Sequence, residues 1–134
     1  MFTDVEYRFL TAHSEGRLSS IGPDNAPQVY PVSFVVDAVA GCIEIGGARL
    51  RDSPQYRNIR RDPRVTLVVY DESSPLMGTD PRYGRRIEIR GVAEASERST
   101  PAMPGFGTDI IRIRPVRVQT WNLEGPGRQD RFVN

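Results

Sequence analysis

Six short segments of this 134-residue chain have the composition of β-strands, and turns rich in glycine and proline separate several of them. Residues 64–70 are the most apolar, and residues 86–95 alternate apolar and polar side chains through Ile87, Ile89 and Val92. The other strand segments are residues 17–21, 28–36, 42–45 and 110–121, the last in two parts, Ile110–Arg114 and Val116–Trp121, hinged at Pro115. Short strands joined mainly by turns pair antiparallel, and closing such a sheet into a barrel removes its unpaired edges. The sequence therefore predicts a mainly β, six-stranded antiparallel barrel.

Two short α-helices complete the predicted fold. Thr3 and Glu6 have the spacing of a capping box at the start of a helix over residues 4–13. Ser53-Pro54 combines a favourable N-cap with a proline at the first helical position, which predicts a second helix over residues 54–61.

The remaining segments are predicted as loops, apart from one proline within a strand. Pro31 lies inside residues 28–36 and has no N–H to donate, so we expect a sheet edge or a bulge there. Residues 72–85 and 96–108 have the composition of loops. Residues 122–134 show no periodicity and are predicted to form an extended tail. We expect residues 1–134 to form one domain.

The composition excludes several kinds of chemistry. A single cysteine, Cys42, makes neither an intramolecular disulfide nor a cysteine-based zinc site, and a single histidine, His13, rules out a two-histidine metal centre. The near balance of 18 basic and 17 acidic residues argues against nucleic-acid binding through bulk charge. All 18 basic residues are arginine. We expect no protein-bound metal, and these exclusions favour an organic cofactor.

The first residues and the lengths of the apolar segments indicate the cellular location of the protein. Met1 to Glu6 is acidic and polar, unlike a secretory signal, and no apolar run approaches the roughly 20 residues that a membrane span needs. We therefore expect a cytoplasmic protein that does not bind membranes.

The segment around the second predicted helix is the most informative for function. Gly46-Gly47 is followed by Arg49 and Arg51, and then by the helix start at Ser53. Free backbone N–H groups at a helix start favour an anion, and arginine side chains add bidentate contacts to phosphate. Arg57 extends the set along the helix. The alternative is an ordinary helix start with solvated arginines.

Other candidate side chains are single residues without a motif. Ser33 has the position to offer its hydroxyl or backbone to a planar heterocycle, or to face outward from its strand. Trp121 ends the last strand, where it either stacks on a ring system or belongs to the core or an interface. His13 is interpreted as a helix C-cap and Cys42 as an apolar filler. No catalytic residue is identified.

The order and spacing of short motifs along nearly the whole chain resemble the pyridoxamine 5′-phosphate oxidase-like split β-barrel proteins, in particular their small flavin- or deazaflavin-dependent oxidoreductases. The motifs that carry this resemblance are Gly16-Arg17-Leu18, Gly22-Pro23-Asp24, Ala26 to Val29, Pro31-Val32, Ile45-Gly46-Gly47, Tyr56 to Val65, Ile89-Arg90-Gly91, Ile111 to Pro115, Val118 to Trp121 and Gly125-Pro126.

The resemblance implies a split β-barrel homodimer with two equivalent sites at the subunit interface, each binding coenzyme F420 or FMN. The loop before the short helix and the start of that helix would bind the phosphate, and the strand around Pro31 would lie beside the flavin-like ring. The implied phosphate-side residues are Ala48, Arg49, Arg51, Ser53, Gln55 and Arg57, and the implied ring-side residues are Pro31, Val32 and Ser33.

One departure from the family pattern concerns this phosphate site. Relatives usually carry a lysine just inside the helix, where this chain has Pro54 and Gln55. The loss of one desolvated charge contact, roughly 1.5–3 kcal/mol, would weaken binding about 10- to 150-fold. Either the arginines compensate, or this protein binds its anion weakly or uses another ligand.

The leading hypothesis is an F420-dependent oxidoreductase that transfers a hydride between the reduced deazaflavin and a small conjugated substrate. The alternatives are an FMN-dependent oxidase or flavin reductase of the same fold, and a non-catalytic barrel that binds a cofactor. An oligonucleotide-binding barrel ranks last, because the arginines cluster in one loop instead of alternating with aromatic residues along strands.

Overall fold

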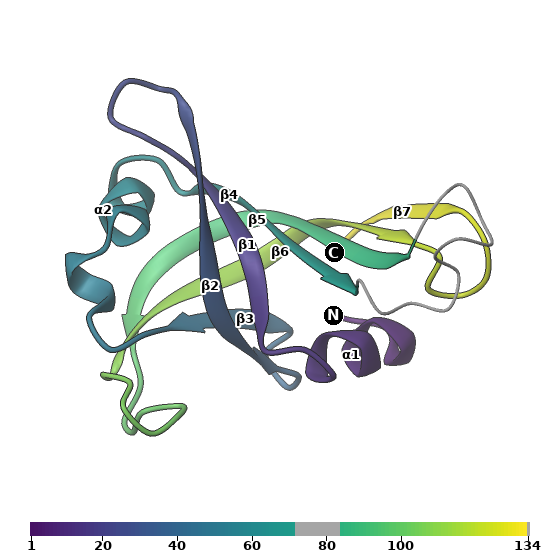
Figure 1. Cartoon of the computed structure of the whole chain (residues 1–134), viewed down its shortest axis with the longest axis horizontal. Helices are drawn as coiled ribbons and strands as arrows, with labels where there is room; N and C mark the ends of the chain where they lie inside the picture. Colours follow the sequence, from purple (N-terminus) through teal and green to yellow (C-terminus); the bar gives the residue numbers. More distant parts are fainter. Residues whose placement is uncertain (72–83, 134) are drawn as a thin grey trace.

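The computed structural model describes residues 1–71 and 84–133, which form seven strands and two α-helices (Figure 1). The elements are α1 (Asp4–Thr11), β1 (Glu15–Ile21), β2 (Pro27–Asp37), β3 (Cys42–Gly46), the 3₁₀ turn η1 (Leu50–Asp52), α2 (Pro54–Arg61), β4 (Arg64–Asp71), β5 (Arg85–Glu97), β6 (Asp109–Trp121) and β7 (Arg128–Phe132). The predicted loop over residues 72–85 falls almost entirely outside the described residues. Neither described helix has the length and apolar character to span a membrane.

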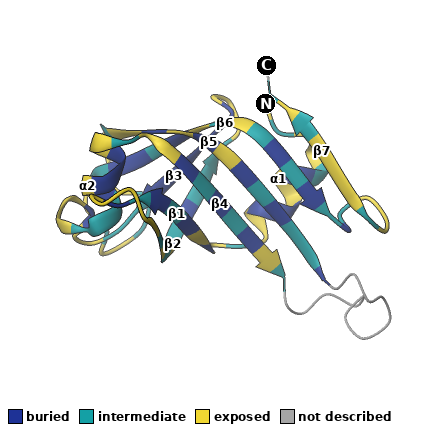
Figure 2. Cartoon of the chain, turned by 90° about the horizontal axis from the view of Figure 1, so that it is seen from above, coloured by how far each residue is buried: buried dark blue, intermediate teal, exposed yellow. Residues whose placement is uncertain are grey.

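The first six strands form a closed antiparallel barrel, as predicted. They pair in the order β3-β2-β1-β4-β5-β6, and β3 also pairs with β6 through Ile43–Ile113 and Ile45–Ile111, which closes the ring. Buried side chains alternate with exposed ones along the strands (Figure 2). The inward-facing side chains, among them Leu18, Leu67 and Ile89, form one hydrophobic core.

Pro31 lies at an open stretch of strand edge, which confirms the prediction of an edge or a bulge. β2 pairs with β1 from Pro27 to Ser33, whereas its pairing with β3 begins only at Ser33. Among the described strands, the side of β2 that faces away from β1 is therefore unpaired at Pro31 and Val32. A proline is tolerated there because no neighbouring strand on this side needs the N–H that proline lacks.

The prediction of an extended tail after residue 121 is wrong for residues 128–132. These residues form β7, which pairs antiparallel with the second half of β6, from Arg117↔Phe132 to Trp121↔Arg128. Two ion pairs fix the added strand, one of them between Arg117 and Asp130. The segment has no local strand pattern, because its place in the sheet depends on partners that lie far away in the sequence.

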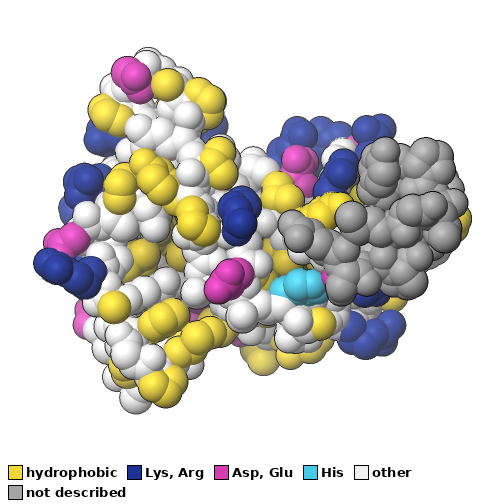
Figure 3. Space-filling view, in the orientation of Figure 1, with side chains coloured by type: hydrophobic (Ala, Val, Ile, Leu, Met, Phe, Trp, Pro, Cys, Tyr) yellow, Lys and Arg dark blue, Asp and Glu magenta, His cyan; other side chains and the backbone are white. Residues whose placement is uncertain are grey.

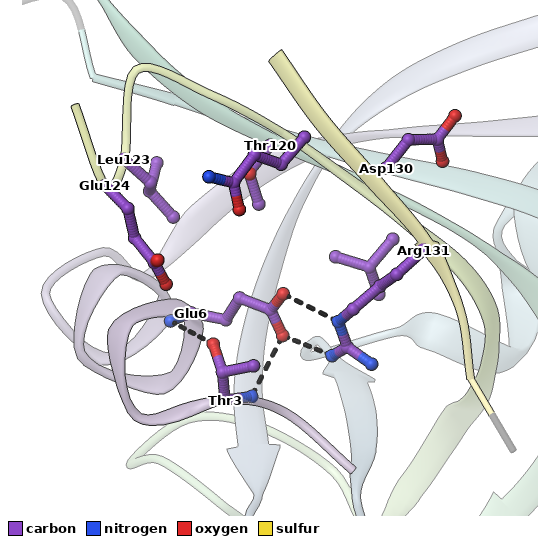
Figure 4. A pocket seen from close by; sticks show the side chains of 9 residues that line it. Thr3, Glu6, Thr120, Leu123, Glu124, Asp130 and Arg131 are labelled. Carbon is purple, nitrogen blue, oxygen red and sulfur yellow. Dashed lines mark hydrogen bonds and ion pairs between the residues drawn. The ribbon is translucent and has the colours of Figure 1, made fainter. Parts of the chain in front are cut away.

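The second of these ion pairs joins the two ends of the chain. Glu6 of α1 is buried, and both of its carboxylate oxygens accept from Arg131 of β7, with Nε at 3.0 Å from Oε2 (Figure 4). The same carboxylate accepts from the backbone N–H of Thr3, which completes the predicted capping box of α1. The helix ends at Thr11, two residues before its predicted end. The adjoining cavity, about 90 Å³, is smaller than typical ligand sites.

Replacing Arg131 with alanine is expected to lower the free energy of unfolding by about 2 kcal/mol, because it leaves the buried Glu6 carboxylate without its cationic partner. The Arg128→Ala variant is the matched control, because Arg128 lies exposed on the same strand. Urea unfolding of both variants measures the difference. Equal stabilities would show that the pair contributes nothing.

Candidate functional site

The arginine-rich segment turns away from the barrel directly after β3. Leu50 is buried and anchors η1, whereas the flanking side chains of Arg49 and Arg51 are 84% and 71% exposed. Arg49 lies 3.4 Å from Asp52, and Arg51 lies 3.3 Å from Asp109 at the start of β6. The Asp109 carboxylate raises the pKa of Arg51, so this guanidinium stays charged. Both pairs are exposed and hold the arginines only loosely.

The start of α2 offers fewer backbone donors than the sequence led us to expect. The Ser53 hydroxyl accepts from the N–H of Tyr56 at 3.2 Å and donates to the carbonyl of Leu50 at 2.6 Å. The N–H of Ser53 also donates to Leu50, and Pro54 has no N–H at all. An anion at this helix start would therefore depend on arginine side chains more than on backbone amides.

Arg57 folds back over the same turn. Its Nη1 donates to the carbonyl of Asp52 at 2.8 Å, and its side chain is exposed. Arg57 therefore lies on the helix start next to η1, where Arg51 is located. Gln55, at the second helical position, is half-buried, and Ala48 is exposed in the turn before η1. The predicted phosphate-side residues thus lie together on one continuous surface segment.

A buried amide holds α2 against the barrel, and the sequence analysis missed it. The Nδ2 of Asn58 donates to Ser20 of β1 at 3.0 Å and to Gln28 of β2 at 2.8 Å, and its Oδ1 accepts from Arg61 at 2.8 Å. The only sequence signal is that Asn58 lies between Tyr56 and Ile59, on the buried side of the helix. This network fixes the helix start relative to β2.

The predicted ring-side residues meet the arginine segment at the junction of β2 and β3. Ser33 pairs with Gly46, the last residue of β3, and the chain continues from there into Ala48 and η1. Figure 1 shows β2, β3 and the turn into α2 on the same side of the barrel. Pro31 is exposed and Ser33 half-buried, but the side chain of Val32 faces the core. Val32 therefore has no side chain to offer a ligand, and its backbone pairs with Gly16 of β1.

Trp121 lies at the opposite end of the barrel from these residues. It ends β6, whereas Asp109, the partner of Arg51, begins that strand. Thirteen residues of strand span roughly 40 Å when extended. The indole lies under the guanidinium of Arg86, at 4.8 Å from the ring centroid. Trp121 therefore joins the other predicted residues only if a second chain supplies it.

A second buried charge, Glu44, supports the loop between β5 and β6. Its side chain is 5% exposed on the outer side of β3, where it forms ion pairs with Arg98 and with Arg112, the latter at 3.2 Å. The sequence signal was weak, because Glu44 occupies the polar position of an alternating strand. The loop over residues 98–108 covers this carboxylate and lies next to Gly46 and Gly47.

The single histidine and cysteine have structural surroundings. His13 follows α1, and its Nδ1 lies 2.7 Å from the carbonyl oxygen of Phe9, which confirms the predicted C-cap. Cys42 is buried, and burial raises the pKa of its thiol. Within residues 1–71 and 84–133, no three histidine, cysteine or acidic side chains are grouped to bind a metal ion.

Comparison with known proteins identifies relatives along nearly the whole chain. The family model described as pyridoxamine 5′-phosphate oxidase matches residues 2–122. A 5a,11a-dehydrotetracycline/5a,11a-dehydrooxytetracycline reductase of Streptomyces rimosus subsp. rimosus is 36% identical over 125 residues, which are 92% of this chain and 85% of that protein.

Two solved structures illustrate the likeness of fold. A heme binding protein from Mycobacterium smegmatis superposes with a TM-score of 0.70 at 18% identity, over 98% of this chain and 59% of that chain. An F420 reductase superposes with a TM-score of 0.60 at 23% identity, over 84% of this chain and 94% of that chain.

Proposed function

The chain belongs to the pyridoxamine 5′-phosphate oxidase family and is an oxidoreductase, and from this premise we propose that it uses coenzyme F420 to reduce a conjugated double bond. The observation that carries the proposal is the 36% identity to a dehydrotetracycline reductase over 92% of the chain. The name of that enzyme describes a substrate with a carbon–carbon double bond that is reduced. We propose a substrate of the same class, a conjugated carbonyl compound, for this chain.

The residues present fit a cofactor that carries a ring on an anionic tail. Arg49, Arg51 and Arg57 surround one helix start and are weakly engaged at the surface, so their guanidinium groups are free to turn toward a phosphate. The open edge of β2 beside Pro31 matches the polar edge of a flavin-like ring, whose carbonyl and N–H groups require backbone partners. The missing lysine is offset by these three arginines.

When bound, the reduced deazaflavin supplies a hydride to one carbon of the double bond. The arginines would hold the tail, the exposed face of Pro31 would pack against the ring, and the carbonyl of Pro31 at the open edge of β2 would meet the ring's polar edge. The protein would contribute orientation, and a water molecule at the open side of the site would supply the proton that the second carbon needs. No covalent intermediate with the protein is required.

FMN is the alternative cofactor, because its phosphate and ring need the same donors. FMN would make the protein an oxidase or a flavin reductase of the same fold. A protein that binds either cofactor without turnover would be the non-catalytic barrel.

We also propose that the protein is a homodimer with its sites at the subunit interface. The outer face of β1, β4, β5 and β6 has an open groove of about 420 Å³, lined by Ile21, Val92 and Val116 among others. Val92 is 38% exposed and Val116 46% exposed, and burial of such a patch favours association. A second chain on this face also offers a way to bring Trp121 to the cofactor.

Replacing Val92 with arginine is expected to raise the dissociation constant of the dimer at least tenfold. Val92 pairs in register with Arg64 and Arg114, so the new cation would be buried between like charges in the interface. The Val39→Arg variant is the control, because Val39 is exposed in the turn between β2 and β3. Sedimentation velocity across a dilution series measures both variants, and an unchanged dimer in Val92→Arg would place the interface elsewhere.

The activity itself is tested by turnover. Purified protein is mixed with reduced F420 and a 5a,11a-dehydrotetracycline, and the return of the oxidised deazaflavin absorbance is followed. We expect reoxidation that depends on both protein and substrate, with a product that has gained two hydrogens. If the Streptomyces rimosus relative is active in the same assay and this protein is not, the proposed reaction is wrong.

A further inference from the structure

A cavity of about 300 Å³ lies between the end of α1, strand β2 and the loop over residues 98–108. Its walls are apolar and include Leu10, Phe34, Val35 and Met103. Its polar lining residues are Thr11, His13 and Ser14, and Thr11 and Ser14 are exposed and so mark the rim. This volume lies at the lower end of the range for small-molecule sites.

The cavity adjoins the predicted ring-side strand. Val35 lies two residues beyond Ser33 on β2, which corresponds to roughly 7 Å along a strand. Met103 and Val35 also line a crevice of about 10 Å³ whose other walls include Ser33, Gly46 and Phe106. Met103 therefore lines both the cavity and the crevice beside the place proposed for the cofactor ring.

The loop that carries Met103 is fastened at both ends. At its start, Arg98 forms an ion pair with the buried Glu44, and its N–H donates to the carbonyl of Thr108 at 2.8 Å. At its end, the N–H of Gly107 donates to the carbonyl of Gly47 at 3.0 Å. The ring of Phe106 lies so close to Gly46 that an added Cβ there would be 2.8 Å from it.

These contacts attach the loop to the same turn that leads into the arginine segment. Hydrophobic side chains gather on the lobe at the lower left of Figure 3, where Figure 1 shows the loop between β5 and β6. A wall held by an ion pair and backbone hydrogen bonds keeps its shape, which suits it to discriminate among ligands by size.

We propose that this cavity is the substrate site, and that Met103 determines which substrates it admits. The inference rests on the proposed reductase function. No charged side chain belongs to the described lining, so the site takes an uncharged, flat, fused-ring part of a conjugated carbonyl compound. The hydroxyl of Ser14 and the Nε2 of His13 are the polar groups left for a hydroxyl group of the ligand, because Thr11 donates to backbone carbonyls and His13 Nδ1 lies 2.7 Å from the carbonyl oxygen of Phe9. One end of the bound rings reaches toward Ser33, beside the cofactor.

Methionine-methyl NMR tests the location without any cofactor. The chain has three methionines, so ¹³C-methyl labelling gives few signals, and a Met103→Leu variant assigns the one that belongs to Met103. Oxytetracycline is the probe, added to the whole protein with and without oxidised F420. We expect the Met103 signal to shift saturably, while the signal of Met1, which is 64% exposed, stays in place.

Kinetics test the role of Met103 in specificity. Met103→Phe narrows the cavity and is expected to raise the KM for a dehydrotetracycline at least tenfold, with F420 affinity and Tm within error of the parent. Met103→Ala is expected to leave F420 affinity unchanged. It is expected to lower the ratio of kcat/KM for small substrates to kcat/KM for larger ones. Val39→Phe, which introduces the same phenyl ring in an exposed turn, is the control and is expected to change neither the KM nor the F420 affinity.

The outcomes separate this inference from the reductase proposal. A shifted Met103 signal without deazaflavin binding would refute the cofactor assignment and support the cavity as a ligand site. The opposite result is deazaflavin binding and turnover with an unshifted Met103 signal, or with an unchanged KM in Met103→Phe. It would refute the cavity as the substrate site and leave the proposed reductase function intact.

Discussion

Replacing Arg51 and Arg57 together with alanine is expected to weaken the binding of oxidised F420 at least about 100-fold. Each guanidinium that reaches the phosphate contributes roughly 1.5–3 kcal/mol once water is excluded, or about tenfold or more in affinity. The two contacts add if the side chains act independently. Stability is expected to stay nearly unchanged, because Arg51 forms an exposed ion pair and Arg57 an exposed hydrogen bond.

The control for this double variant is Arg60→Ala. Arg60 lies exposed in the last turn of the same helix, so its loss changes the net charge without touching the helix start. Fluorescence titration of the deazaflavin and thermal unfolding are measured for the parent, each single variant, the double variant and the control. If the double variant binds F420 as tightly as the parent does, neither arginine contacts the cofactor.

Replacing Gly91 with alanine is expected to destabilise the fold by about 3 kcal/mol and to lower Tm by about 10 °C. A Cβ at Gly91 would lie 2.4 Å from the carbonyl oxygen of Arg114 and 2.9 Å from the side chain of Ile113. Gly91 pairs with Pro115 at a register shift between β5 and β6. The backbones of the two strands must separate there, which disturbs the longest pairing of the barrel.

Gly47→Ala is the matched control, since a Cβ at Gly47 would have no contact nearer than 4.0 Å. We expect its Tm to stay within a few degrees of the parent. Differential scanning calorimetry compares the two variants. Equal transition temperatures would mean that the strands tolerate a side chain at the register shift.

Local patterns were sufficient to predict most of the secondary structure. Alternation predicted β5, and the Ser53-Pro54 signal placed the start of α2 at the observed residue. They could not predict β7, because its five residues form a strand only by pairing with β6 and by contacts with the start of the chain. The hinge suggested by Pro115 is likewise absorbed into one continuous strand β6 that is accommodated by Gly91 opposite.

The positions of the candidate arginines were easier to predict from the sequence than the hydrogen bonds around them. The spacing of glycines and arginines brought Arg49, Arg51 and Arg57 to one surface, as expected. The number of free backbone N–H groups at the helix start was overestimated. The Ser53 hydroxyl accepts from the N–H of Tyr56 and donates to the carbonyl of Leu50, so that N–H is not free for an anion. Glu44 escaped notice because its two arginine partners lie more than fifty residues away in the sequence.

The placement of Trp121 depends on quaternary structure, which a single sequence does not reveal. In one chain the indole lies at the far end of β6 from Asp109 and is covered by Arg86. Its assignment to the cofactor site therefore stays a prediction, tied to the proposed dimer. Trp121→Ala would affect cofactor affinity only if the dimer places this residue beside the ring.

The most direct test of the central claim is a fluorescence titration of the purified protein with oxidised F420, with FMN titrated in parallel. The account predicts saturable binding of F420 in the micromolar range or tighter, and weaker binding of FMN. Saturable binding of FMN alone would mean that the cofactor of this site is FMN and not F420. The absence of a saturable change with either cofactor at high micromolar concentration would contradict the claim that the arginine segment and the open edge of β2 form a cofactor site.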